Sequence, residues 1–277
     1  MKKIYMIVGP TASGKSEFAI RLAQYLNGSI INADSIQVYQ DIPLLTARPD
    51  EAEQQNIPHL LYGYLDKNSH CSVNDWIKQV IPILKTVSTP ILVGGTGLYI
   101  KALTDGLNDI PEVDPSIRQS VRHMPLEEVK AKVIDCIATD PQRLRRALEV
   151  QLTTGKPLSY FQQQPLKRPI EADFDITLIN RPRQEIRTLC HTRFLKMLDK
   201  GAIEQAKTLQ ALNPTGGITK AIGYKEICAY LDCQISYDKM IDLAVTATRQ
   251  YAKRQQTWFK HQLPPAKIIE NPLNFKI

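Results

Sequence analysis

Runs of apolar residues alternate with segments of helical periodicity along most of the chain. Apolar runs of strand length occupy residues 4–8, 29–33, 60–65, 90–93 and 174–179. Between the first two runs, Phe18, Leu22 and Leu26 recur at the spacing of one helix face. Strands that are apolar throughout are typical of a parallel sheet covered by helices on both faces. The pattern therefore predicts an α/β core built on a parallel sheet.

The stretch from residue 110 to residue 169 interrupts this alternation. Asp114 and Asp140 each precede a proline, which is the pattern of an N-cap with proline at the first helical position. Gly155 follows the second pattern at the distance expected of a helix end. We expect three short helices here. The predicted organisation is a core with its first part at 1–109, a small all-helical insertion domain at 110–169, and a second part with C-terminal helices at 170–277.

The longest predicted helix covers residues 237–260 and has two contrasting faces. On a helical wheel, one stripe is expected to pack against the core and comprises Met240, Ala244, Ala247, Tyr251 and Trp258. The opposite stripe is basic and polar and comprises Arg249, Lys253, Gln256 and Lys260. A basic stripe is either solvated or lies along a polyanion. The wheel alone leaves both interpretations open.

Composition adds a preference for anionic partners. The 277 residues carry 35 Lys and Arg against 28 Asp and Glu, a net charge of +7, which suits a polyanion such as nucleic acid. No apolar run approaches the ~20 residues of a membrane span, so we expect no membrane association. The five cysteines are scattered without metal-ligand spacing, which predicts free thiols in a cytoplasmic protein.

The strongest motif lies between the first predicted strand and the first predicted helix. It matches the pattern G-x-x-x-x-G-K-[ST] and comprises Gly9, Pro10, Thr11, Ala12, Ser13, Gly14, Lys15 and Ser16. Such a loop turns backbone N–H groups toward an anion at a helix N-terminus. Lys15 would add a full positive charge, and the Ser16 hydroxyl would bind Mg²⁺. The alternative is a glycine-rich turn before a helix. The strand–loop–helix context favours a diphosphate or triphosphate site.

Two further strand ends bear on the chemistry. Asp34 follows the second predicted strand, and in a parallel sheet that position faces the ligand crevice beside the phosphate loop. Its alternative role is to cap a following helix. After the strand at 90–93 an ATPase usually has a carboxylate for Mg²⁺, but this chain has Gly-Gly-Thr. Asp66 is only a weak substitute. The loop therefore predicts diphosphate binding without the rest of the equipment of an ATPase.

Six segments, taken together and in order, identify a family resemblance. They are residues 9–16, 34–39 (DSIQVY), 90–101 (PILVGGTGLYIK), 140–150 (DPQRLRRALEV), 221–226 (AIGYKE) and 247–259 (ATRQYAKRQQTWF). The chain resembles the tRNA dimethylallyltransferases, also called tRNA isopentenyltransferases, from near its first residue to about His261. The resemblance implies a fold like that of the P-loop nucleotide kinases. It also implies transfer of a dimethylallyl group from dimethylallyl diphosphate to N6 of the adenosine 3′-adjacent to the anticodon, with diphosphate released.

The resemblance also implies roles for particular residues. Residues 9–16 would hold the donor's diphosphate with Mg²⁺ on Ser16, while Lys15 and Arg193 stabilise its charge as it leaves. Asp34 would accept the proton from the attacking amine, and Thr96 would help to orient the adenine. The expected tRNA-binding residues are Asp34, Ser35, Ile36, Gln37, Thr96, Arg118, Gln142, Arg143, Leu144, Arg145, Arg146, Lys220 and Lys225. The partners implied are dimethylallyl diphosphate and the tRNA anticodon stem-loop. Separately, we expect a monomer, since no obligate protein partner is evident in the sequence.

Two features depart from the family pattern. The family usually has Gly-Thr-Ala-Lys where this chain has Leu45-Thr46-Ala47-Arg48. The segment between Arg118 and Asp140 is shorter than in the family and lacks part of a helical hairpin. We expect the first to alter a loop and the second to alter the grip on RNA or the choice of tRNA.

Two alternative functions fit parts of the sequence. One is a small-molecule enzyme of the same build, either a P-loop kinase or a prenyltransferase acting on free adenine nucleotides, which would not need the arginines at 143–146. The other is a nucleotide-dependent RNA-binding protein without catalysis, which leaves Asp34 and Thr96 without a role. The identity of the labelled acceptor, tRNA or AMP, separates the two enzymes.

Overall fold

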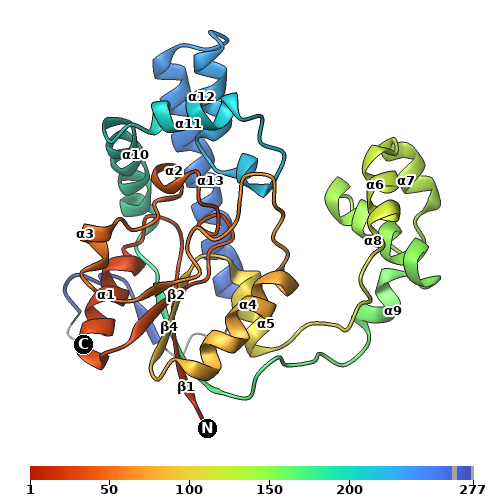
Figure 1. Ribbon diagram of the computed structural model, residues 1–277, viewed down its shortest axis with the longest axis horizontal. Coiled ribbons are helices and arrows are strands. Elements are labelled where there is room, and N and C mark those ends of the chain that lie inside the picture. The colour runs from red at the N-terminus through yellow and green to blue at the C-terminus, as the bar shows by residue number, and fades with distance from the viewer. Residues whose placement is uncertain (264–266, 276–277) are drawn as a thin grey trace. The chain divides into compact units, whose positions relative to one another are not determined.

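The computed structural model describes residues 1–263 and 267–275 and divides into two compact units (Figure 1). The core unit comprises residues 1–104 and 170–277, and the helical unit comprises Asp105–Pro169. Residues 264–266 and 276–277, which fall in the predicted 170–277 segment, lie outside the described residues.

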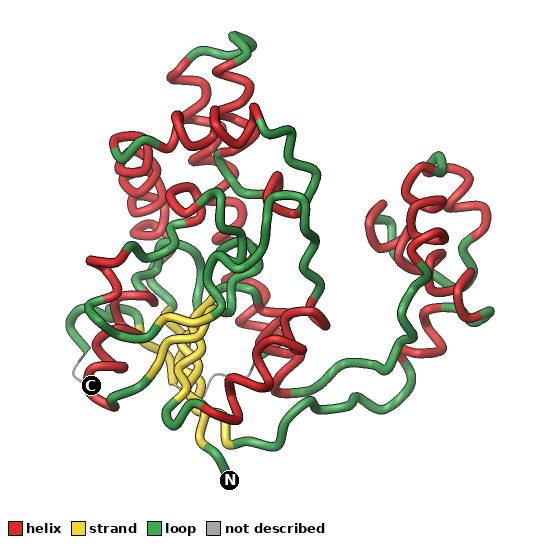
Figure 2. Tube along the Cα trace, in the orientation of Figure 1, coloured by secondary structure: helices red, strands yellow, loops and turns green. Residues whose placement is uncertain are grey.

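The core unit is organised around a six-stranded parallel sheet in the order β3-β2-β4-β1-β5-β6. Figure 2 shows the strands of this sheet in yellow. The strands are β1 (Lys3–Val8), β2 (Ser29–Asn32), β3 (His59–Leu60), β4 (Pro90–Gly94), β5 (Asp173–Ile179) and β6 (Lys267–Ile269). The central strands are almost wholly buried, as their uninterrupted apolar sequences predict. Because all strands are parallel, their carboxyl ends share one edge of the sheet.

Helices cover both faces of this sheet. On one face, α1 (Lys15–Leu26) packs Phe18, Ala19 and Ala23 against the sheet. On the other face lie α4 (Val73–Thr86), α5 (Gly97–Thr104) and the end of α13 (Tyr237–Gln262). Trp76 of α4 is fully buried, and its indole N–H donates to the carbonyl of Asn32 at 3.0 Å. This bond and the packing hold α4 beneath the end of β2.

A second apolar cluster joins the remaining helices of the core unit. It packs α10 (Arg183–Asp199), α11 (Ala202–Ala211), α12 (Tyr224–Leu231) and the first half of α13 against residues 38–45. Three short elements complete this unit: α2 (Pro43–Thr46), α3 (Glu51–Gln54) and the 3₁₀ helix η1 (Gly217–Lys220). The cluster anchors α10 and α13, which both supply side chains to the site described below.

The helical unit contains four helices where three were predicted. They are α6 (Pro115–His123), α7 (Leu126–Lys132), α8 (Pro141–Thr154) and α9 (Leu158–Gln162). The predicted caps are confirmed, since Asp114 and Asp140 accept backbone N–H bonds at the starts of α6 and α8, and Gly155 ends α8. The additional helix α9 forms because Phe161 is buried against Val113 and Val150. The sequence did not predict α9, because one buried aromatic residue in a five-residue helix produces no helical periodicity.

Two predicted elements of the core unit are wrong in extent. The third strand was expected at 60–65 but β3 ends at Leu60, because Leu61 and Gly63 both have left-handed backbones (φ 60° and 57°) that a strand cannot continue through. The helix expected to open at Lys220 begins at Tyr224 instead, after η1 and a turn at Gly223.

Both stripes of the longest helix differ in part from the prediction. Met240 and Ala244 are buried as expected, whereas Ala247, Tyr251 and Trp258 are only half-buried. The buried face also includes polar residues, namely Thr248 and Gln255. Gln256, assigned to the basic stripe, is half-buried and bonds to the segment after β5. Hydropathy places glutamine on the surface, and only tertiary contacts reveal these buried amides.

Candidate functional site

Four loops that follow neighbouring strands meet at the carboxyl edge of the sheet. The phosphate loop (residues 9–16) follows β1, Asp34 lies two residues after β2, Gly95 and Thr96 follow β4, and Arg181 lies two residues after β5. In the sheet these strands are consecutive, in the order β2-β4-β1-β5. The ligand crevice of an open α/β sheet lies at this edge. The topology thus gathers segments that are about 170 residues apart in sequence.

The phosphate loop has the geometry of an anion-binding loop. Gly14 adopts the left-handed conformation (φ 88°) that lets the chain enter α1. The Lys15 ammonium donates to the carbonyl of Pro10 at 3.1 Å. Loss of water lowers the pKa of Lys15 from 10.5 to about 8; the Asp34 carboxylate opposes this change and the Arg193 guanidinium adds to it. A half-buried cation beside a second cation is well suited to receive an anion.

The Ser13 hydroxyl points to the same conclusion. Ser13 is only 1% exposed, and its Oγ has no hydrogen-bond partner among the described residues. A buried hydroxyl without a partner is energetically unfavourable. A phosphate oxygen in the loop would supply such a partner.

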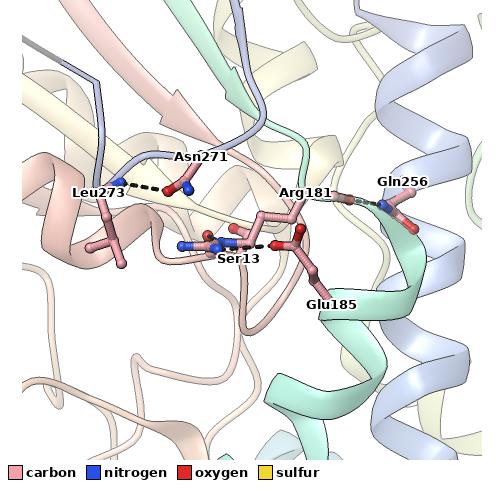
Figure 3. A network of polar contacts seen from close by, with 6 residues as sticks. All are labelled: Ser13, Arg181, Glu185, Gln256, Asn271 and Leu273. Atoms are coloured by element: carbon pink, nitrogen blue, oxygen red, sulfur yellow. Dashed lines mark hydrogen bonds and ion pairs between the residues drawn. The ribbon is translucent and has the colours of Figure 1, made fainter.

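The outer side of the phosphate loop is held by Arg181 (Figure 3). Its Nε donates to the Ser13 carbonyl at 2.9 Å, while its guanidinium pairs with Glu185 at 3.2 Å. Gln256 of α13 donates to the Arg181 carbonyl at 3.1 Å. On the far side of α1, Arg21 donates to the Pro272 carbonyl at 2.8 Å. These bonds fix the loop before any ligand arrives.

Arg193 of α10 is a second arginine that bonds to the phosphate loop. Its guanidinium donates to the Thr11 hydroxyl at 2.5 Å. Burial lowers the pKa of Arg193, and the neighbouring Cys190 and Asp34 oppose this shift. A guanidinium remains charged under such conditions and presents several donors to phosphate oxygens. The structure thus brings together Lys15, Arg193 and the loop, as predicted from the resemblance.

Ser35, the neighbour of Asp34, and Thr96 are linked across the ends of β2 and β4. The Thr96 hydroxyl accepts the Ser35 N–H at 3.0 Å, and one oxygen of the Asp34 carboxylate accepts the Ile36 N–H at 3.0 Å. No helix follows Asp34 within residues 35–42, so the alternative role as a helix cap is wrong. The bond to Ile36 instead forms a local turn that holds the carboxylate half-exposed at the crevice.

Two cavities open on this arrangement. The larger, here called the phosphate-loop cavity, has a volume of about 1180 Å³ and is lined by residues 12–17, by α2 and α3 and by Arg48, Arg193 and Lys196. The smaller, here called the Asp34 cavity, has a volume of about 310 Å³ and is lined by Thr11, residues 34–36, Lys220 and Tyr251 among others. Arg193 and Met197 line both. Arg193 and Met197 therefore lie where the two cavities meet.

Several predicted site residues have other positions. The Gln37 amide donates to the carbonyls of Thr46 and Ala47 at 2.9 and 3.0 Å, so it holds the loop before Arg48 and does not line the Asp34 cavity. Arg48, at the departure from the family pattern, donates to the Tyr39 carbonyl at 3.3 Å. Asp66, the weak substitute for an ATPase carboxylate, bonds to Ser69 in an exposed turn and lines neither cavity.

The predicted tRNA-binding residues of the helical unit divide into exposed and buried ones. Arg118, Gln142 and Arg143 are exposed. Leu144 is 4% exposed and packs against Val121 and Val129. The predicted tRNA contact of its side chain is therefore wrong, because that side chain is not available to a ligand. Half-buried Arg145 donates to the Val121 carbonyl, and Arg146 pairs with Glu149 at 3.6 Å. Outside this unit, Lys220 and Lys225 are exposed.

Residues able to hold a metal are few at the site. Among residues 1–263 and 267–275, no group of three His, Cys, Asp or Glu side chains is placed to bind a metal ion. Mg²⁺ commonly takes one or two protein oxygens and completes its shell with water and substrate phosphates. The exposed Ser16 hydroxyl beside Lys15 fits that mode. The residues present thus suit Mg²⁺ only as part of a complex with diphosphate.

Sequence reasoning missed three site residues of α13. Tyr251 and Arg254 line the Asp34 cavity, and Gln255 contacts the phosphate loop. Burial raises the pKa of the Tyr251 phenol, and the Asp34 carboxylate adds to the increase. Tyr251 and Gln255 stand four residues apart and so share a helix face. The signal that could have located them is the family-matching segment 247–259, which contains all three residues.

A parallel sheet with a glycine-rich loop between β1 and α1 defines the class: this is a P-loop α/β protein. The family model for IPP transferase matches residues 37–262. The chain belongs to the IPP transferase family. Among the described residues, no helix has the length and apolar character needed to span a membrane.

Curated relatives and solved structures agree with this assignment. The tRNA dimethylallyltransferase of Bartonella tribocorum is 41% identical over 95% of this chain and 96% of its own length. That of Zymomonas mobilis is 40% identical over 99% and 93%. A eukaryotic dimethylallyltransferase acting on tRNA superposes with a TM-score of 0.79 at 28% identity, covering 94% of this chain and 70% of that one. The tRNA isopentenylpyrophosphate transferase of Bacillus halodurans gives 0.71 at 29%, covering 97% and 89%.

Proposed function

We propose that this protein transfers a dimethylallyl group from dimethylallyl diphosphate to N6 of the adenosine 3′-adjacent to the anticodon of tRNA. The observation that carries the proposal is the position of Arg193, which lines both cavities and whose guanidinium bonds to the phosphate loop. A transfer reaction needs two substrates that meet at one point. Family membership supports the identity of the two substrates.

The donor's diphosphate lies in the phosphate-loop cavity under this proposal. The bond from the prenyl C1 carbon to the diphosphate oxygen breaks, and its electron pair leaves with the diphosphate. Lys15, the loop N–H groups and Arg193 stabilise that growing charge. Ser16 would hold Mg²⁺, which when bound neutralises further charge on the diphosphate.

The acceptor adenine enters the Asp34 cavity. The new bond joins adenine N6 to the prenyl carbon, and the proton of the amine passes to the Asp34 carboxylate. The amine is a weak nucleophile because its lone pair is delocalised into the ring, so removal of the proton assists the step. To reach the cavity the base must leave the stack of the anticodon loop. Tyr251 lines the cavity and offers an aromatic face to such a base.

Cationic side chains on the surface would contact the phosphates of the tRNA. Within the helical unit these are Arg118 and Arg143, with Gln142 as a polar neighbour; within the core unit they are Lys220 and Lys225. Exposed cations of this kind bind the RNA backbone in a salt-dependent manner.

We further propose that the protein acts in the cytoplasm as a monomer.

The identity of the acceptor tests the proposal. The purified protein is incubated with labelled dimethylallyl diphosphate and either tRNA or AMP, and in parallel with labelled ATP. We expect label on tRNA alone. Label on AMP would indicate a prenyltransferase for free nucleotides, and phosphoryl transfer from ATP would indicate a kinase. RNA binding without any transfer would indicate the non-catalytic alternative.

A further inference from the structure

Gln255 is a buried amide that connects two loops of the site. Its side chain is 5% exposed. Its Oε1 accepts the N–H of Thr11 in the phosphate loop at 2.8 Å, and its Nε2 donates to the carbonyl of Gly95 at 2.9 Å. The amide packs closely against Gly95, because a Cβ at Gly95 would lie 2.2 Å from that Nε2. Gly95 is thus needed to admit the amide, and both of its polar ends are paired.

The two loops that Gln255 joins face different substrates of the proposed reaction. Thr11 belongs to the phosphate loop, whose following residues 12–17 line the donor's cavity, and its hydroxyl accepts from Arg193, which lines both cavities. Gly95 precedes Thr96, whose hydroxyl is bonded to the Ser35 N–H beside Asp34, on the side of the acceptor. Both loops are attached to the ends of adjacent strands, β1 and β4, but strand pairing ends at Val8 and Gly94. Beyond that point Gln255 links the backbones of the two loops.

We propose that Gln255 is a positioning residue that sets the distance between the donor's diphosphate and the acceptor adenine. This inference rests on the proposed function and deepens it. Gln255 touches neither cavity and takes no part in the chemistry. It fixes the direction of the Thr11 N–H, which therefore points to Gln255 rather than to an anion. Reacting groups must be held in a near-attack geometry, and a displacement of about 1 Å costs on the order of 10²-fold in rate.

Replacement with methionine removes both hydrogen bonds while keeping side-chain length. For Gln255→Met we expect the single-turnover rate at saturating substrates to fall on the order of 10²-fold, with the affinities for inorganic diphosphate and for tRNA unchanged. The matched control is Gln262→Met on the last residue of the same helix, which loses only an exposed bond to Lys101. A rate above half that of wild type, or a loss explained by weaker diphosphate binding, would overturn the proposal.

Replacement with glutamate gives a second and independent readout. A protonated carboxyl has the hydrogen-bonding pattern of the amide, since its O–H can donate to Gly95 and its C=O can accept from Thr11. An ionised carboxylate cannot donate to Gly95. We therefore expect the rate of Gln255→Glu, divided by that of wild type, to fall as pH rises, whereas the ratio for Gln255→Met stays flat.

The glutamate variant keeps the proposal testable if the methionine variant does not fold. A low ratio that does not change with pH would overturn the positioning role, because it would indicate a purely structural defect. Transfer by the wild-type protein distinguishes a failure of the proposed function from a failure of the role proposed for Gln255. If wild type transfers no prenyl group to tRNA, the proposed function fails; if wild type transfers normally and both variants match it, only the role of Gln255 fails.

Discussion

The phosphate-loop cavity and the Asp34 cavity differ in the origin of their binding groups. The first takes its anion-binding loop from one continuous segment, residues 12–17, although residues from 43–55 and 189–200 also line it. The second takes its lining from five separated segments: Thr11, residues 34–36, 45–46, 190–197 and 220–222, together with part of α13. A local motif specifies an anion site by itself. A cavity for a base requires the whole fold, and its specificity depends on contacts between distant segments.

The first test removes the carboxylate of the Asp34 cavity. Asp34→Asn keeps the shape of the side chain but cannot accept a proton, so we expect a loss of ~10²–10⁴ in the single-turnover rate. Binding of tRNA and donor, measured separately, should stay near normal. Asp66→Asn, in an exposed turn outside both cavities, is the matched control and should transfer at the wild-type rate.

A normal rate for Asp34→Asn would mean that the Asp34 carboxylate has only a structural role, in the local turn with Ile36. If the rate loss were accompanied by an equal loss of adenine binding, the carboxylate would position the base rather than accept its proton.

The second test acts on the phosphate-loop cavity. Lys15→Ala removes a charge that stabilises the leaving diphosphate and should lower the transfer rate by ~10²–10³ while leaving the protein folded. Lys3→Ala, which removes an exposed lysine paired with Asp175, is the control. Retention of more than half the wild-type rate at saturating donor would contradict the role of Lys15.

The third test uses the pKa of Lys15, which burial lowers to about 8 in the free protein. Below that pH the ammonium is charged and can pair with diphosphate; above it the free protein loses the charge. We expect kcat/KM for the donor to fall by up to about tenfold per pH unit above 8. Lys15→Arg stays charged over this range and should remove the decline. A wild-type profile that is flat to pH 9.5 would contradict this account.

The smallest effects are expected on the surface of the helical unit, where the arginines have unequal roles. Exposed Arg143 should contribute a phosphate contact, so Arg143→Ala should reduce the log–log salt slope of tRNA binding by somewhat under one unit. Replacing Arg145, which bonds to the Val121 carbonyl, should mainly lower the melting temperature of the helical unit. Lys130, already paired with Glu127, is the charge-matched control. An unaltered salt slope for Arg143→Ala would mean that the Arg143 side chain is only solvated and makes no phosphate contact.

The same contrast explains what the sequence could predict. The strands β1, β2, β4 and β5, the phosphate loop and the place of Asp34 at a strand end all follow from local patterns of apolar residues and glycine. The short β3 does not, because the left-handed backbone at Leu61 has no residue signature. Gln256 is predicted on the polar stripe and no local pattern marks Gln255, since the contacts of both amides are with loops that are far away in sequence. Local patterns predicted the anion site, whereas the Asp34 cavity required the tertiary structure.

The central claim is that donor and acceptor occupy separate cavities that meet at Arg193, with Asp34 in the acceptor's cavity. The most direct measurement is a structure of the protein bound to an unreactive donor analogue and an anticodon stem-loop. We predict diphosphate oxygens on the N–H groups of residues 13–16 and on Lys15, with adenine N6 facing the Asp34 carboxylate in the smaller cavity. A diphosphate bound away from the loop, or an adenine bound outside the Asp34 cavity, would contradict the account.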